Sequence, residues 1–212
     1  MKITKFGHSC LLVEEEGVRL LFDPGNYSTI PENLANIDAI IITHEHQDHY
    51  TPEILKKILD TNKDAQVITN SGVGAQLDKA GIAYQIIEDG QGIKIGTVEI
   101  EGTGTQHALI YPTLPRTANT GYLVAGKFFH PGDSFETIPA RQVEILALPV
   151  IAPWCRVAEA VDFAKAIKPK YAFAIHDANL KWPGMAHGLS QQILPKEGID
   201  FRILEDGKEY EF

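Results

Sequence analysis

Residues 43–50 of the chain read THEHQDHY and place four side chains that can bind a metal within six positions. These side chains are His44, His46, Asp48 and His49. They directly follow the apolar run DAIII (38–42), which is typical of a strand buried on both faces. In an extended segment alternate residues point the same way, so the first three would share one side and the last would face another. One loop could therefore serve two neighbouring metal ions, and imidazole with carboxylate suits Zn, Mn or Fe better than Ca or Mg.

Two simpler explanations of this loop are chance and a structural zinc. A chance H-x-H-x-D-H pattern is expected in on the order of one chain in a thousand of this composition. A structural zinc needs four ligands in a closed shell, usually with cysteine. The pattern therefore favours a catalytic metal loop.

The bulk composition indicates one ordinary globular domain. With 212 residues, 44% hydrophobic and 22% charged, the chain can bury a sizeable core, which predicts a single domain over 1–212. A net charge of −9 would repel a phosphate backbone, so no nucleic-acid partner is expected. The start, MKITKFGHSC, lacks the apolar core of a signal peptide, and no apolar stretch approaches the ~18 residues that cross a bilayer. The two cysteines make no disulfide framework, so we expect a cytoplasmic protein without membrane attachment.

Strand-like and helix-like runs alternate along the whole chain. KITKF, CLLVEE and VRLLFD predict a meander of strands at the start. Thr51 as N-cap and Pro52 at the first helical position predict a helix after the histidine loop, and Gly81 is expected to end a second helix. The pattern occurs in two similar halves, before and after about Thr103, with no linker between them. It predicts one α/β domain.

The loop THEHQDH resembles the signature of the metallo-β-lactamase-fold hydrolases. The five motifs of that family occur in order, each at the end of a predicted strand or in the loop after it. They are LLFDP with Asp23, THEHQDH, GTQHA with His107, HPGDS with Asp133 and FAIHD with His176. An ordered set is far more specific than the loop alone. The resemblance implies a four-layer αββα sandwich with the site at the seam of the two halves.

The resemblance also implies a role for each motif residue. The implied ligands are His44, His46 and His107 for a first ion, Asp48, His49 and His176 for a second, and Asp133 as the bridge between them. Asp23 would hold the histidine loop through hydrogen bonds. An aspartate before Pro24 can also be a simple turn former.

The implied cofactors are two divalent transition-metal ions, with zinc favoured and manganese or iron as alternatives. Two such ions (+4), two carboxylates (−2) and a bridging hydroxide (−1) leave about +1 in the site. The ions would lower the pKa of a shared water from about 15.7 toward about 7 and polarise the scissile carbonyl or phosphoryl oxygen. Asp48 would orient the hydroxide and Asp133 would hold both ions, so these two are the expected catalytic residues.

Several further residues have two open interpretations. His8, in FGHSC, matches a similar GH[AS] in lactonase-like and phosphodiesterase-like branches of the family, so it either flanks the pocket or lies in a surface turn. Arg116, in a proline-rich loop after His107, either grips a substrate phosphate or carboxylate or is an ordinary surface arginine. Trp154 and Cys155 could line the pocket. No activating base accompanies Cys155, so a catalytic thiol is not expected.

His130 and His187 have no second ligand near them in sequence and are expected to be structural. Within the family, Asp133 stands where many β-lactamases have cysteine, and His46 where flavodiiron oxygen reductases usually have glutamate. Few residues follow His176, so the helical domain of glyoxalase II-like enzymes is not expected, and the stretch from Asp133 to His176 is too short for the inserted domain expected of RNA-processing relatives.

The interpretation that is left is a minimal member resembling the ascorbate-6-phosphate lactonase-like group. We expect it to hydrolyse a small anionic ester, lactone or phosphoester. A metal-dependent phosphodiesterase or nuclease and a non-catalytic metal-binding protein are the alternatives, because fold and metal site are shared across many chemistries.

Overall fold

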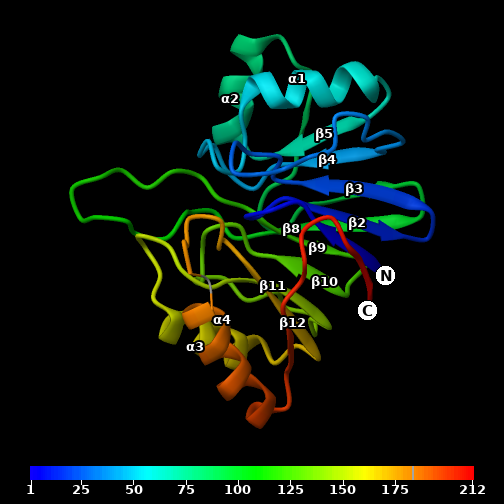
Figure 1. Ribbon diagram of the computed structural model, residues 1–212. Coiled ribbons are helices and arrows are strands. Elements are labelled where there is room, and N and C mark those ends of the chain that lie inside the picture. Colours follow the sequence, from blue (N-terminus) through cyan, green and yellow to red (C-terminus); the bar gives the residue numbers. More distant parts are fainter. Residues whose placement is uncertain (183) are drawn as a thin grey trace.

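The computed structural model describes residues 1–182 and 184–212. Two seven-stranded sheets pack face to face, and helices cover both outer faces (Figure 1). The helices of the first sheet are α1 (Pro52–Thr61) and α2 (Ser71–Ala80). Those of the second are α3 (Val157–Ile167), α4 (Gly184–Ile193) and the short 3-10 helix η1 (Leu194–Glu197). The predicted four-layer αββα sandwich is therefore confirmed.

The first sheet is built mainly from the start of the chain. Its strands, in spatial order, are β14 (Glu209–Glu211), β1 (Lys2–Lys5), β2 (Leu11–Glu15), β3 (Val18–Phe22), β4 (Ala39–Ile41), β5 (Gln66–Thr69) and β6 (Gln85–Ile86). Strands β1, β2 and β3 form the predicted antiparallel meander. Strands β3 and β4 are parallel, so their carboxyl ends, which lead into Asp23 and the histidine loop, lie side by side.

The second sheet contains the central part of the chain. Its strands, in spatial order, are β13 (Asp200–Arg202), β12 (Tyr171–Ile175), β11 (Ile145–Pro149), β10 (Phe128–His130), β9 (Gly121–Val124), β8 (Val98–Thr103) and β7 (Gly92–Ile95). The predicted boundary near Thr103 is wrong, because β7 and β8 already belong to this sheet. The antiparallel pairing of β8 with β9 places them there, and a strand pattern does not specify which sheet a hairpin joins.

Aromatic and branched side chains fill the space between the sheets. Phe128 contacts Phe22 edge-on, with ring centroids 5.7 Å apart, and lies parallel to Phe173 at 6.4 Å. All three are fully buried. Large side chains interdigitated in this way fix the strand ends relative to one another. The loops at these ends therefore start from rigid positions.

The helix boundaries follow the local signals in the sequence. The Thr51 side chain accepts a hydrogen bond from the Ile54 N–H, and Pro52 begins α1, as predicted. Gly81 ends α2 with a left-handed φ of 69°. Strand β14 pairs with β1, so the two ends of the chain lie side by side (Figure 1). Within the described residues, no helix has both the length and the hydrophobicity to cross a bilayer.

Candidate metal centre

The predicted ligand residues sit in loops that follow strand ends of both sheets. The histidine loop follows β4, Asp133 follows β10 and His176 follows β12, whereas His107 lies four residues beyond β8. In sandwiches of this kind, parallel strands bring their carboxyl ends to one edge, where ligand sites form. The two sheets contribute such loops to a single place.

Two groups of side chains converge there. They are His44, His46, His107 and Asp133 in one group and His8, Asp48, His49 and His176 in the other, and within each group the ligand atoms lie within 4.8 Å of one another. The structure thus brings together all seven residues proposed as ligands and adds His8. His8 is fully buried, so its interpretation as a surface-turn histidine is wrong.

Asp133 contacts both groups. Its Oδ2 atom lies 3.4 Å from His107 Nε2 and 3.0 Å from His176 Nε2. Its Oδ1 atom lies 3.2 Å from His49 Nε2. Asp133 is therefore the residue that joins the two groups.

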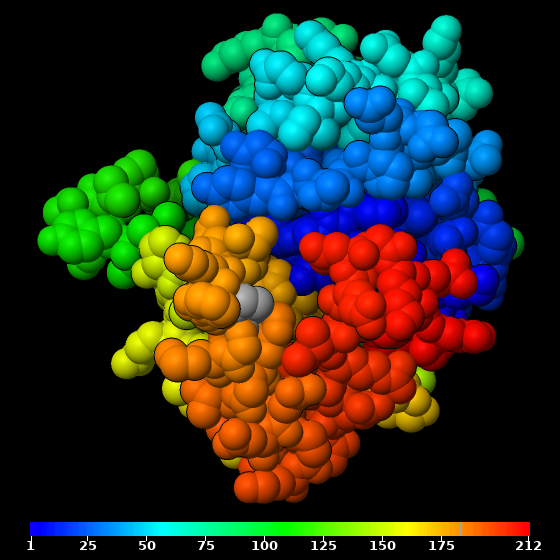
Figure 2. All heavy atoms as spheres, viewed as in Figure 1, coloured from blue at the N-terminus to red at the C-terminus, as the bar shows by residue number. Residues whose placement is uncertain are grey.

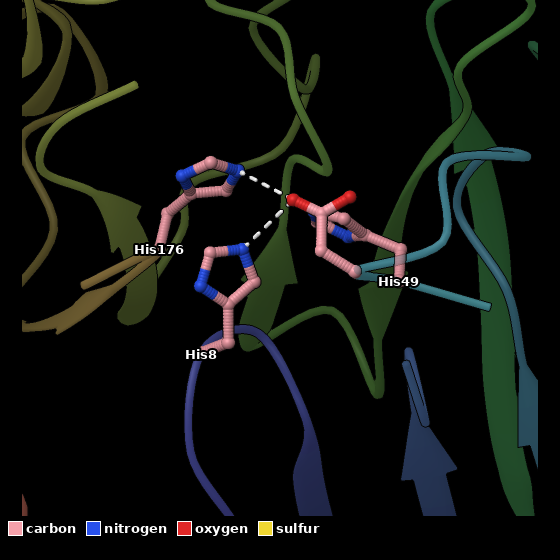
Figure 3. Close-up of side chains that lie close together, drawn as sticks. His8, His49 and His176 are labelled. Carbon is pink, nitrogen blue, oxygen red and sulfur yellow. Dashed lines mark hydrogen bonds and ion pairs between the residues drawn. The ribbon is translucent and has the colours of Figure 1, made fainter. Parts of the chain in front are cut away.

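Asp48 Oδ2 is a second point of convergence. It lies 3.1 Å from His8 Nε2, 3.7 Å from His176 Nε2 and 4.0 Å from His49 Nε2. Figure 3 shows the His8 and His176 rings pointing toward one carboxylate oxygen, with His49 beside it. The Asp48 side chain is 22% exposed, so this carboxylate also faces the solvent side of the site.

Asp23 holds the histidine loop in place. Its Oδ1 atom accepts a hydrogen bond from the Thr43 N–H at 2.8 Å, and its Oδ2 atom accepts one from the Thr43 hydroxyl at 2.7 Å. Oδ2 also lies 2.8 Å from His49 Nδ1. The φ of Asp23 is 41°, so the residue forms a turn as well. Both interpretations of Asp23 therefore describe part of what it does.

Most of the histidines are oriented by a bond on Nδ1. His44 Nδ1 lies 3.1 Å from the Thr43 hydroxyl, His107 Nδ1 lies 2.6 Å from the Ala108 carbonyl, and His176 Nδ1 lies 3.0 Å from the Ile151 carbonyl. Asp23 contacts His49 Nδ1 in the same way. The Nε2 atoms of these four histidines are therefore directed into the site. Such second contacts fix the tautomer and ring orientation of metal-binding histidines.

His8 has the opposite arrangement. Its Nε2 atom contacts Asp48, and its Nδ1 atom has no hydrogen-bond partner among the described residues. Burial lowers the pKa of His8, so the ring is neutral at neutral pH and can donate one hydrogen bond, from Nε2 to Asp48. The geometry makes His8 the hydrogen-bond partner of Asp48.

The residues present fit a pair of transition-metal ions. The contacts of Asp133 with His49, His107 and His176 are close but lack the geometry of hydrogen bonds. Buried side-chain atoms without a hydrogen-bond partner in the described part of the chain therefore include His49 Nε2, His107 Nε2, His176 Nε2 and Asp133 Oδ1. Buried polar groups are normally paired, and leaving one unpaired costs about 1–3 kcal/mol. Four such atoms converge on the site, and imidazole nitrogen with carboxylate oxygen is the donor set of zinc, manganese and iron sites.

The carboxylates are in the form that binds cations. Burial works to raise the pKa of Asp48, but the hydrogen bond from His8 and the charge of His49 outweigh it and hold that pKa at about 2. Burial likewise opposes ionisation of Asp133, yet the neighbouring His176 and His49 keep its pKa well below the usual range. Both side chains are therefore charged at neutral pH.

Two glycines let backbone segments approach the site closely. A Cβ on Gly25 would lie 1.9 Å from the Asp48 carbonyl oxygen. A Cβ on Gly132, which has a φ of 61°, would lie 2.2 Å from Asn119 Oδ1. The same Asn119 oxygen accepts a hydrogen bond from the Asp133 N–H. The glycines in DPG and HPGDS are thus required by the fold of the site.

The site opens into a cavity of about 270 Å³, termed here the metal cavity. Its lining combines metal-capable side chains with residues of the surrounding loops. The lining residues are Asn26, Tyr27, His46, Gln47, Asp48, His107, Ile110, Asp133, Pro153, Trp154, His176 and Asn179. A concave site with convergent polar groups is the expected location for chemistry.

Arg116 is not among the residues that line this cavity. Its guanidinium contacts Glu136 at 2.7 Å, and its Nε donates a hydrogen bond to the His107 carbonyl at 2.6 Å. Of the two interpretations of Arg116, this position agrees with a partly exposed surface arginine and gives no support to a residue that grips the substrate. It supports the backbone of His107.

Cys155 is buried, and burial raises the pKa of its thiol to about 12, as expected for a residue that is not a nucleophile.

His130 is buried against Phe22, with parallel rings 5.4 Å apart, and belongs to neither group. His187 contacts Asp177 Oδ2 at 2.9 Å, and Lys5 Nζ contacts the other oxygen of that carboxylate at 2.6 Å. This buried network, next to His176, joins β1 to α4.

No motif in the sequence predicts the contact between Trp154 and Asp133. The indole N–H of Trp154 donates a hydrogen bond to Asp133 Oδ2 at 2.8 Å. The two residues come from the loops after β11 and β10, which are parallel neighbours. Their adjacency in the sheet was the available signal, but no motif marks the tryptophan.

Comparison with known proteins identifies relatives across the whole chain. Residues 2–176 match the family described as "Beta-lactamase superfamily domain". A UPF0173 protein of Pyrococcus abyssi is 32% identical, with 100% of this chain and 98% of that protein covered. A UPF0173 metal-dependent hydrolase of Carboxydothermus hydrogenoformans is 28% identical, with 98% of each covered. The structure of Igni18, a metallo hydrolase from Ignicoccus hospitalis, superposes with a TM-score of 0.78 at 22% identity, covering 100% of this chain and 98% of that one, and shows the same fold.

Proposed function

The chain belongs to the beta-lactamase superfamily domain family and is a metal-dependent hydrolase, and we propose that it uses two transition-metal ions to hydrolyse a small anionic ester, lactone or phosphoester. The observation that carries the proposal is the contact of Asp133 with both groups of candidate ligands. A protein that only binds metal does not require two groups of ligands that share one carboxylate beside a cavity.

In this proposal His44, His46 and His107 would hold one ion, Asp48, His49 and His176 would hold a second, and Asp133 would serve both. Bound there, the ions supply Lewis acidity, which makes water a nucleophile near neutral pH and polarises a carbonyl or phosphoryl oxygen. We favour zinc for this donor set, and the proposal also holds with manganese or iron.

The protein's own residues orient the reactants. Asp48 faces the metal cavity and is held by His8, so it is placed to accept a hydrogen bond from the attacking water and to take up its proton. Trp154 fixes one oxygen of Asp133. Asp23 fixes His49 and Thr43, and so keeps the loop in one conformation.

The charge of the molecule favours a small substrate. Among the residues that line the metal cavity, none is lysine or arginine. The ions and two carboxylates leave a small positive charge that can hold one anionic group, while a net charge of −9 repels a long phosphate backbone.

Small-molecule turnover is expected to exceed RNA cleavage and to depend weakly on salt. The experiment compares a phosphorylated lactone, an aryl phosphodiester and a structured RNA across a salt series. Recognition of one charge at close range is little screened, whereas binding to many phosphates weakens steeply as salt rises. Efficient RNA cleavage that collapses at high salt would replace this proposal with a nuclease.

His8 is expected to act through Asp48. Replacing His8 with leucine should lower kcat about 10–100-fold, the usual effect of losing a hydrogen-bond partner of a metal ligand. KM should change little, because His8 does not line the metal cavity. His8→Gln, which restores an N–H donor, should recover part of the rate. Elemental analysis should find both ions in His8→Gln, and loss of one ion in both variants would show instead that His8 is itself a ligand.

A further inference from the structure

A second cavity adjoins the metal cavity. Its volume is about 360 Å³, and it is termed here the side cavity. The residues that line it are Ala108, Phe135, Glu136, Ile138, Trp154, Glu159, Asp162, Phe163 and Ala166. Trp154 lines both cavities, and Ala108 in one is two residues from Ile110 in the other.

A row of aromatic rings leads from the candidate ligands into the side cavity. The Trp154 ring centroid lies 5.9 Å from that of His107 and 6.1 Å from that of His176. Phe135 follows at 5.0 Å from Trp154, and Phe163 of α3 lies 4.6 Å beyond Phe135 in a stacked arrangement. A substrate whose reacting bond lies beside Asp133 would therefore meet an apolar surface along this row.

The same wall continues into the segment 108–115. This segment stands out from the body of the molecule in Figures 1 and 2, and its exposed side chains include Leu109 at 50% and Tyr111 at 61%. It contains no charged residue. Ile138, across the side cavity, is also 50% exposed. Apolar surface gathered beside a binding site indicates an apolar ligand.

The charges at the rim exclude an anionic tail. Glu136 is paired with Arg116 at 2.7 Å, and Glu159 with Arg156 at 2.7 Å. Asp162 adds a further carboxylate to the lining, so the rim carries no surplus of positive charge. A carboxylate or phosphate on the tail would be repelled, whereas a neutral chain would not.

We propose that the side cavity is a subsite for a neutral hydrocarbon chain of the substrate, whose scissile ester or lactone bond would lie in the metal cavity. The inference rests on the proposed function for the position of that bond. It narrows the substrate class to acyl or alkyl esters and lactones with an apolar chain.

The test is a homologous series of straight-chain esters and lactones, from two to twelve carbons, with the metal-loaded protein. Burying one methylene group is worth up to about a fourfold change in binding, so kcat/KM should rise by up to about fourfold per methylene and level off when the cavity is filled. Ile138→Glu should flatten this dependence by placing a charge in the wall. The matched control is Ile203→Glu, which charges an isoleucine of similar exposure outside both cavities and should keep the full dependence.

Failure of the subsite can be told apart from failure of the proposed function. Hydrolysis that is independent of chain length, or a dependence that Ile138→Glu leaves intact, would overturn the subsite while the hydrolase assignment stands. If no ester or lactone is hydrolysed, binding of decanol decides. With Trp182→Phe, Trp154 is the sole tryptophan and reports on both cavities. In the Trp182→Phe variant, decanol should change the fluorescence of Trp154. When Ile138→Glu is added, decanol should leave that fluorescence unchanged. Absence of any change in the Trp182→Phe variant would reject the subsite.

Discussion

Asp133→Ala is expected to empty both metal positions and to reduce hydrolysis by at least about 100-fold. Loss of a residue that merely orients a metal ligand already costs about 10–100-fold. Asp133 contacts His107 and His176 through one oxygen and His49 through the other, so its removal affects both groups at once. Elemental analysis of the purified variant, together with kcat/KM on the best substrate of the ester series, measures the two effects.

Cys155→Ser is the matched control for this variant. Cys155 is buried in the loop beside Trp154, and its thiol has a pKa of about 12, so it is protonated at neutral pH. Its replacement should leave activity within a few-fold. An inactive Cys155→Ser protein together with an active Asp133→Ala protein would reverse the assignment and require a thiol mechanism.

Removal of the metal with a chelator is expected to abolish hydrolysis, and addition of zinc, manganese or iron should restore it. Without Lewis acidity, water at the site keeps a pKa of about 15.7 and is no nucleophile at neutral pH. The reconstituted chain should hold close to two ions. Binding should also stabilise the fold, by about 2.7 kcal/mol for each site at a metal concentration 100 times its Kd.

Trp154 provides a direct readout of this step. Its indole N–H contacts Asp133, whereas Trp182, the other tryptophan, is 77% exposed. In Trp182→Phe, a fluorescence titration should show a change that is complete at two equivalents of metal. One equivalent, or none, after reconstitution at neutral pH would contradict the two-ion proposal, whichever metal is used.

Local signals in the sequence predicted those parts of the fold that depend on local physics. Thr51, Pro52 and Gly81 set helix ends through bonds within a few residues, and all three act as expected. The apolar run before His44 predicted a buried strand, and β4 is buried throughout. The predicted boundary between the two halves at Thr103 was wrong because it depends on which strand pairs with β8. That strand is β9, which lies well beyond the local sequence.

The candidate site shows the same division. The motif residues lie close together as the sequence predicts, because each motif follows a strand whose end the fold brings to one edge. His8 was ambiguous because its burial depends on the pairing of its backbone with His176, whose N–H donates to the His8 carbonyl. Trp154 belongs to no motif, and only the three-dimensional packing reveals its bond to Asp133.

The order of the ligands along the chain has a consequence for how the protein is made. The loop around His44 leaves the ribosome long before His107, Asp133 and His176, which come from the second sheet. Strand β14, synthesised after every one of these residues, pairs with β1 and completes the first sheet. Domains are synthesised at roughly 5–20 residues per second, so for several seconds the early loop has only part of its ligand set. In the two-ion proposal, the complete ligand set would therefore form only once both sheets have docked, and a chain that ends before His176 would lack part of it.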